Sequence, residues 1–229
     1  MFKDRIPRKP KNILMVDFVL NHSPKSYLNG QMQPTINVSD NGVTAVILAG
    51  GESSRMRQDK SLISIHGVPL IQSIFHQLST RFEKIVISAN DPQKYAFMNC
   101  LVIPDETPHV GPLMAILSVL KRLQEPIFVV ATDIPEIPWT ILNNILALER
   151  QYPDCQAIVP ITSTGEYEPL FAIYRPEIIG TIAKALQENQ RHIYGIFAEI
   201  PVAILALKVD ETIPNLNHPE DFERYVENQ

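Results

Sequence analysis

The residues best suited to phosphate chemistry lie between positions 50 and 60. Gly50 and Gly51 end a run of apolar and β-branched residues, 43–49. The polar loop after them carries hydroxyls, charges and no aromatic residue: Ser53, Ser54, Arg55, Arg57, Asp59 and Lys60. Because glycine has no Cβ, a strand that stops at paired glycines lets backbone N–H groups approach a phosphate chain. The pattern indicates a nucleotide triphosphate site; the alternative is a tight turn followed by a solvated basic loop.

The loop matches neither of two familiar nucleotide motifs. It lacks G-x-x-x-x-G-K-[ST], which disfavours a P-loop ATPase, and G-x-G-x-x-G, which disfavours dinucleotide binding. An arginine can clamp two phosphate oxygens, whereas a lysine acts as a point charge. Arg55 and Lys60 are therefore the candidate catalytic residues.

Two aspartates follow apolar runs further along the chain. Asp133 ends the uncharged stretch 126–132, where an unpaired buried carboxylate would be costly. Mg²⁺ is usually held by one or two carboxylates together with substrate phosphates, so Asp133 is the candidate metal ligand. Alternatively, Asp133 caps a turn that contains Pro135. Asp105 could contact a nucleotide or could only form an Asx-turn before Pro108.

The elements that would position these residues alternate in type from position 43 onward. Strands are predicted at 43–49, 84–89, 101–104, 126–132, 156–161, 168–174 and 203–209, and helices at 69–82, 111–123, 138–152, 176–189 and 219–228. This alternation predicts a three-layer, Rossmann-like α/β domain with a mostly parallel sheet. Ligands of such sheets bind beyond the carboxyl ends of the strands. The polar residues after the strands, Ser88 and Asn90 among them, should therefore converge.

Residues 1–42 differ in composition from the remainder. They carry a charge of +3, which leaves −8 for residues 43–229, and we expect a poorly ordered extension with a possible translation start at Met32. Cys100 and Cys155 form no CxxC pair and suggest reduced thiols. We find neither a secretory signal nor a run of about 18 apolar residues, and therefore expect a cytoplasmic protein without a membrane partner. The net charge of −5 gives no reason to expect nucleic acid binding.

Several motifs occur in one order along the chain. They are L-A-G-G-x-S-x-R-M-x-x-D-K at 48–60, G-x-P-L at 67–70, Asp105 followed by Gly111-Pro112-Leu113, Asp133-Ile134-Pro135, Glu168-Pro169-Leu170, and Asn215-Leu216-Asn217-His218-Pro219-Glu220-Asp221. In these motifs the chain resembles the MobA-like nucleotidyltransferases, the molybdenum cofactor guanylyltransferases. The resemblance covers residues 43–229.

The resemblance implies transfer of GMP from GTP to molybdopterin (Mo-molybdopterin), with release of pyrophosphate. It implies Mg²⁺ as cofactor, held by Asp133, and contacts with other molybdenum cofactor biosynthesis proteins and recipient molybdoenzymes. With the pattern above, it gives these nucleotide-binding candidates: Leu48, Ala49, Gly50, Gly51, Lys60, Ser88, Asp105 and Asp133. Because the attacking phosphate is already an anion, no strong general base is required.

Three positions depart from the family pattern. Arg57 stands where the family usually has glycine; it costs on the order of 1 kcal/mol if that position needs a positive φ, or else it adds a cation. Ser88 replaces an asparagine used near the nucleotide, and Ala115 replaces a glycine. Two alternatives stay open: transfer of another nucleotide such as CMP, and a nucleotide-binding accessory protein without turnover.

Overall fold

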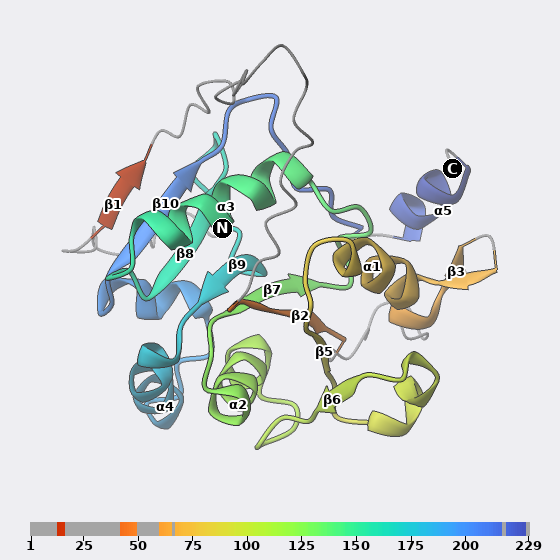
Figure 1. The fold of residues 1–229 in the computed structure, drawn as a ribbon, viewed down its shortest axis with the longest axis horizontal. Coiled ribbons are helices and arrows are strands. Elements are labelled where there is room, and N and C mark those ends of the chain that lie inside the picture. Colours follow the sequence, from red (N-terminus) through yellow and green to blue (C-terminus); the bar gives the residue numbers. More distant parts are fainter. Residues whose placement is uncertain (1–12, 17–41, 50–59, 66, 217–218, 228–229) are drawn as a thin grey trace, which may run out of the picture.

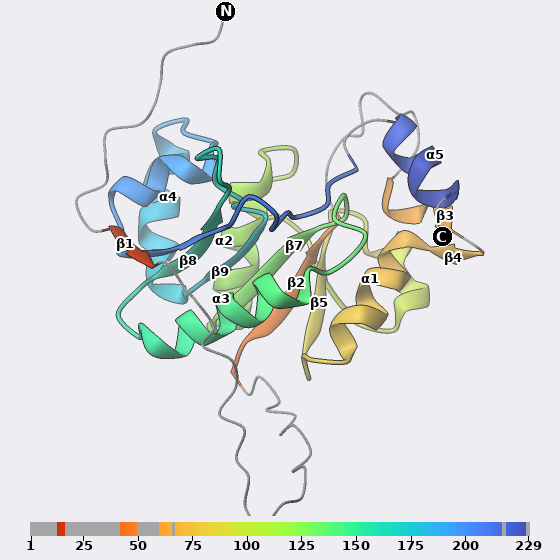
Figure 2. The ribbon, with the colours of Figure 1, turned by 90° about the horizontal axis from the view of Figure 1, so that it is seen from above.

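A sheet of eight strands lies between two layers of helices in the computed structural model of the protein, which describes residues 13–16, 42–49, 60–65, 67–216 and 219–227 (Figures 1 and 2). The strand order is β1 (Ile13–Val16), β10 (Val202–Ala206), β8 (Ala157–Ile161), β9 (Phe171–Tyr174), β7 (Ile127–Ala131), β2 (Thr44–Leu48), β5 (Ile85–Ser88) and β6 (Leu101–Ile103). Every neighbouring pair is parallel except the two that β9 makes with β7 and β8. The predicted α/β class and mostly parallel sheet are confirmed.

The helices have these bounds: α1 (Leu70–Ser79), α2 (Pro112–Leu123), α3 (Trp139–Gln151), α4 (Ile179–Gln187) and α5 (Pro219–Glu227). Short 3-10 segments are η1 (Lys60–Leu62), η2 (Pro92–Met98), η3 (Pro176–Ile178) and η4 (Ile193–Ala198), and β3 (Ser64–Ile65) pairs with β4 (Val68–Pro69) as a small hairpin. Helices α1 and α3 cover one face of the sheet, and α2 and α4 cover the other (Figure 1). None of the described helices is long and apolar enough to cross a membrane.

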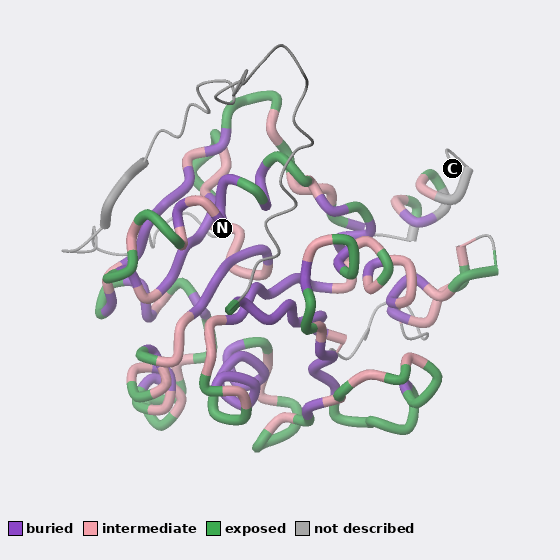
Figure 3. Tube along the Cα trace, in the orientation of Figure 1, coloured by how far each residue is buried: buried purple, intermediate pink, exposed green. Residues whose placement is uncertain are grey.

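The central strands are hydrophobic on both sides. All five residues of β2 and of β7 are buried (Figure 3). Side chains alternate between the two faces of a strand. Ala45 and Ile47 of β2 therefore pack in the core between the sheet and helices α1 and α3. Val46 and Leu48 pack in the core between the sheet and α2. A charged side chain on either face of these strands would be buried against a layer of helices, which explains why both strands are uncharged.

The structure differs from the predicted elements at several places, and η1, η4 and the β3–β4 hairpin are among the elements that were not predicted. The predicted helix 176–189 is divided into η3 and α4, and residues 92–98 form the unpredicted η2. Strand β1 lies within the extension that we expected to be poorly ordered, and it pairs with β10 at the edge of the sheet. The remainder of residues 1–41 lies outside the described residues, so that expectation stays a prediction.

Candidate active site

Four neighbouring parallel strands end at the same edge of the sheet, and backbone hydrogen bonds join the residues that follow them. The Ala49 N–H donates to the Ser88 carbonyl oxygen at 2.9 Å, and the Thr132 N–H donates to the Leu48 carbonyl oxygen at 3.4 Å. The residues after β2, β5 and β7 therefore lie side by side. Because the Ala49 N–H is used by the sheet, N–H donors for a phosphate must come from residues further along the loop.

Asn90 and Asp105, after β5 and β6, bind each other through two hydrogen bonds. The Asn90 Nδ2 donates to Asp105 Oδ2 at 3.0 Å, and the Asp105 backbone N–H donates to Asn90 Oδ1 at 3.0 Å. Burial raises the pKa of the Asp105 carboxyl, while the bond from Asn90 and the nearby His109 lower the pKa in part. Asn90 therefore fixes the carboxylate that was predicted to contact the nucleotide.

Tyr95 supports Ala49, the residue that precedes the predicted phosphate loop. Its hydroxyl donates to the Ala49 carbonyl oxygen at 3.2 Å and is hydrogen-bonded to Ser61 Oγ at 2.9 Å. Tyr95 is 1% exposed and lies in η2, which Asp91 caps by accepting from the Gln93 N–H. The Asp-Pro pair at 91–92 is a helix-start signal that sequence reasoning passed over, but nothing in the sequence pairs Tyr95 with Ala49.

Lys60 and Asp133 are both hydrogen-bonded to Leu216, which comes much later in the chain. The Lys60 Nζ donates to the Leu216 carbonyl oxygen at 3.0 Å, and the Leu216 N–H donates to the Asp133 carbonyl oxygen at 2.7 Å. The neighbouring Asn215 is exposed beside this junction. The structure thus brings together the lysine, the aspartate and the start of the Asn215–Asp221 motif.

Asp133 is a strongly desolvated carboxylate. Burial raises its pKa, and the positive charge of Lys60 and a bond to the Asp133 backbone lower the pKa in part. Its Oδ1 atom is buried and has no hydrogen-bond partner among the described residues. Burial and the charges of Glu166 and Asp133 also raise the pKa of Glu168, so this third carboxylate lies near Asp133.

Sequence reasoning gave Glu168 no role because it considered only residues that follow strands. Glu168 precedes β9, and β9 runs antiparallel to β7. The start of an antiparallel strand lies at the same edge as the ends of its parallel neighbours. The signal that could have revealed it is the short turn before β9, which makes a β8–β9 hairpin possible.

Other predicted site residues are less accessible or are not described. Ser88 is only 2% exposed, so it lies beneath the edge of the sheet. Gly50, Gly51, Arg55 and Arg57 lie outside the described residues. Their roles, and those of the other site residues, stay predictions.

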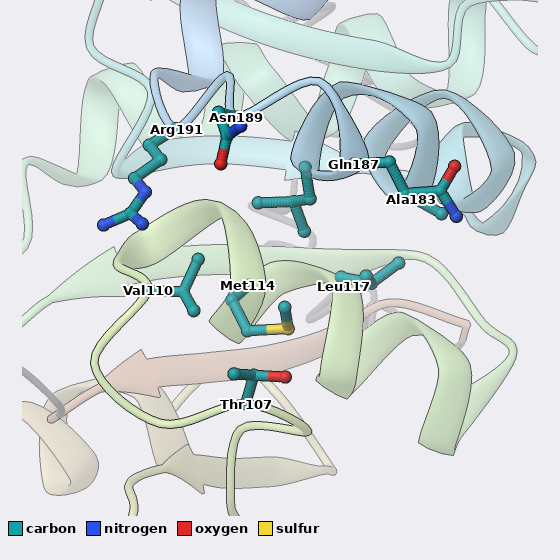
Figure 4. Close-up of a pocket in the computed structure, with 9 residues that line it drawn as sticks. Thr107, Val110, Met114, Leu117, Ala183, Gln187, Asn189 and Arg191 are labelled. Atoms are coloured by element: carbon teal, nitrogen blue, oxygen red, sulfur yellow. The ribbon is translucent and has the colours of Figure 1, made fainter.

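A hollow of about 320 Å³ lies apart from this edge, between α2 and α4 (Figure 4). Val110, Met114 and Leu117 contribute apolar side chains, and Arg191 contributes a charged one. Thr107 comes from the loop that carries Asp105. None of the predicted site residues that the structure describes lines this hollow, so we do not include it in the candidate site.

Comparison with known proteins identifies the family. The sequence profile of the MobA-like NTP transferase domain matches residues 45–202. The chain belongs to the MobA-like NTP transferases. The protein is therefore a nucleotidyltransferase, as its motifs predicted.

Relatives of this MobA-like chain have informative names. The molybdenum cofactor guanylyltransferase of Shewanella frigidimarina is 32% identical, with 78% of this chain and 92% of that protein covered. The "Probable molybdenum cofactor guanylyltransferase" of Natranaerobius thermophilus is also 32% identical, over 82% of this chain and 96% of that protein. The molybdopterin-guanine dinucleotide biosynthesis protein A of Archaeoglobus fulgidus shares the fold, with a TM-score of 0.68 at 22% identity over 81% of this chain and 97% of that one.

The residues of the MobA-like site fit a divalent cation that is held in part by its substrate. Among the described residues, no group of three or more His, Cys, Asp or Glu side chains could hold a metal ion alone. A buried Asp133 oxygen without a partner nevertheless needs a proton or a cation. Mg²⁺ keeps few protein ligands and completes its shell with water and phosphate oxygens, and one or two carboxylates at this edge suffice for that arrangement.

Proposed function

We propose that the protein transfers GMP from GTP to molybdopterin (Mo-molybdopterin), forming the guanine dinucleotide cofactor and releasing pyrophosphate. The observation that carries the proposal is the junction of Lys60, Leu216 and Asp133 at the carboxyl edge of a MobA-like fold. It joins a cation for phosphates to a carboxylate with an unpartnered oxygen. Two relatives at 32% identity are named molybdenum cofactor guanylyltransferase, one of them as probable.

The proposed reaction is a displacement at the α-phosphorus of GTP. An oxygen of the terminal phosphate of molybdopterin forms a bond to that phosphorus. The bond from the α-phosphorus to the oxygen that bridges the α- and β-phosphates breaks, and this oxygen leaves with pyrophosphate. Because nucleophile and leaving group are both phosphates, the protein must position anions and neutralise charge rather than move a proton.

The residues of the edge divide this work. Lys60 and Arg55 would bind the phosphates as cations, and Asp105, fixed by Asn90, would contact the nucleoside. Asp133 would hold Mg²⁺, which when bound screens the charge that develops on the phosphate oxygens. The product would pass to recipient molybdoenzymes, and the reaction would take place in the cytoplasm.

A nucleotide panel tests the proposal. The protein is incubated with Mg²⁺ and molybdopterin and with GTP, CTP or ATP in turn, and pyrophosphate is measured. We expect release with GTP that depends on molybdopterin and is lost in Asp133→Asn, while the exposed control Asp210→Asn behaves as wild type. Release with CTP and none with GTP would indicate a cytidylyltransferase, and GTP binding without release would indicate an accessory protein.

A further inference from the structure

We propose that Glu168 is a second carboxylate that faces the divalent cation together with Asp133, entering the site from the antiparallel strand β9. This inference rests on the proposed function, since it concerns the same cation. It goes beyond that function because it assigns a role to a residue that precedes a strand and that the motif analysis left without one.

The backbone on both sides of Glu168 is held firmly. Its N–H donates to the Pro160 carbonyl oxygen at 2.9 Å, and its own carbonyl oxygen accepts from the Phe171 N–H at 3.1 Å. The next carbonyl, that of Pro169, accepts from the hydroxyl of the fully buried Tyr174 at 2.8 Å. These bonds fix the position and direction of the Glu168 Cα–Cβ bond, and a rigid backbone of this kind is what a ligand-binding residue requires.

The same turn brings Glu168 to the strand that carries Asp133. The Ala131 N–H donates to the Leu170 carbonyl oxygen at 3.1 Å, so the start of β9 is joined directly to the end of β7. Glu168 stands two residues before this bond and Asp133 two residues after it. The two carboxylates are close enough for the charge of Asp133 to act on Glu168.

The charges at this edge favour binding of a cation between the carboxylates. Among the described residues, the Glu168 carboxylate has neither a hydrogen-bond partner nor an ion-pair partner, and the Asp133 Oδ1 atom has none either. Both proposed substrates carry phosphates, which two ionised carboxylates would repel. Lys60 supplies one positive charge near Asp133, and a divalent cation supplies the remainder.

Binding of Mn²⁺, which substitutes for Mg²⁺ and is detected directly by electron paramagnetic resonance, tests the proposal without turnover. The titration uses the full chain with a non-hydrolysable GTP analogue and no acceptor. We expect Glu168→Gln to weaken Mn²⁺ binding by about tenfold or more, the loss typical of a removed metal-site group. The matched control is Glu166→Gln, which removes an equal charge two residues away from an exposed side chain that accepts from Thr164; it should change the affinity by less than about twofold.

Equal Mn²⁺ affinity in Glu168→Gln and wild type would overturn the proposal, and a raised KM for molybdopterin alone would then assign Glu168 to the acceptor. If Glu168→Gln does not fold, Glu168→Asp keeps the charge but withdraws it by one methylene, and it should also weaken Mn²⁺ binding. A result that contradicts the proposed function can be distinguished from one that contradicts the role of Glu168. If the panel selects CTP, the titration is repeated with the CTP analogue, and the expected loss in Glu168→Gln is unchanged.

Discussion

The Lys60 ammonium donates a 3.0 Å hydrogen bond to the carbonyl oxygen of Leu216, a residue 156 positions later in the chain. The Leu216 N–H in turn donates to the Asp133 carbonyl oxygen at 2.7 Å. Lys60 also lies over the ring of Phe222 in α5, 5.4 Å from the ring centroid. The C-terminal segment therefore positions both the candidate phosphate-binding lysine and the candidate metal ligand.

Replacement of this lysine should remove turnover and loosen the C-terminal segment. In Lys60→Ala we expect kcat/KM for GTP to fall by about a hundredfold or more, because one of the cations that would neutralise the phosphates is lost. Lys60→Arg keeps the charge but changes its shape and should recover only part of the activity. Steady-state kinetics and amide hydrogen exchange across residues 211–216 provide the two measurements.

The control for Lys60 is a lysine at the opposite edge of the sheet. Lys84 is exposed and bridges Glu125 at 2.9 Å, away from the candidate site. Lys84→Ala should leave kcat/KM and exchange at 211–216 unchanged. Wild-type kinetics in Lys60→Ala would refute the assignment of Lys60 as a catalytic residue.

Asp133 should lower the stability of the ligand-free protein, and the effect should depend on pH. Burial raises its pKa above the ordinary value for aspartate, so the folded state disfavours the ionised form. Below the pKa of the unfolded state both states are protonated and there is no penalty. The penalty grows as pH rises through the interval between the two pKa values, and it is complete above the folded one.

Asp133→Asn should consequently raise Tm at neutral pH in a chelator, by about 2–4 °C for a gain on the order of 1 kcal/mol. The difference between variant and wild type should vanish as pH falls below the ordinary range of aspartate. Addition of Mg²⁺ and GTP should reverse the order, since a ligand that needs Asp133 stabilises only the wild type. Thermal melts over a pH series measure all three effects, and a difference independent of pH would contradict the assignment.

Much of the fold could be predicted because its signals are local. The apolar stretches that became β2 and β7 are uncharged over their full length, and α2 begins at Gly111-Pro112, where Gly111 adopts a φ of 113° and Pro112 fills the first helical position. Such features are determined by residues that are close together in the sequence. The direction of β9 is not a local feature, because it depends on whether the β8–β9 connection is a hairpin or a crossover.

The site was predictable only in part, because some of its contacts join segments that are far apart in the chain. Residues after parallel strands, such as Asp105 and Asp133, follow from a general rule about α/β sheets. The support of Ala49 by Tyr95 depends on packing between segments 46 positions apart. Glu168 was missed because an antiparallel strand begins, rather than ends, at the ligand-binding edge.

Tyr95 provides a test of this indirect support. Tyr95→Phe removes the hydroxyl that donates to the partly buried Ala49 carbonyl and is hydrogen-bonded to the buried Ser61. We expect a loss of about 1 kcal/mol, or roughly 2–4 °C in Tm, and a KM for GTP that rises more than kcat falls. Tyr194, 43% exposed, provides the control Tyr194→Phe, which should match wild type in both measurements. An unchanged KM in Tyr95→Phe would show that Ala49 needs no such support.

The position of β1 in the sheet predicts how removal of the N-terminal extension will affect activity and stability. Among the described strands β1 pairs with β10 alone, and β8, β9 and β7 separate that pair from β2. A variant that lacks residues 1–31 should therefore keep kcat/KM for GTP within about twofold. It should nevertheless melt at a lower temperature and aggregate more readily, because the backbone edge of β10 becomes exposed. A variant that lacks only residues 1–10 keeps β1 and should match the full chain in both respects. Loss of activity in the longer deletion, with the fold retained, would mean that the extension contributes to the site.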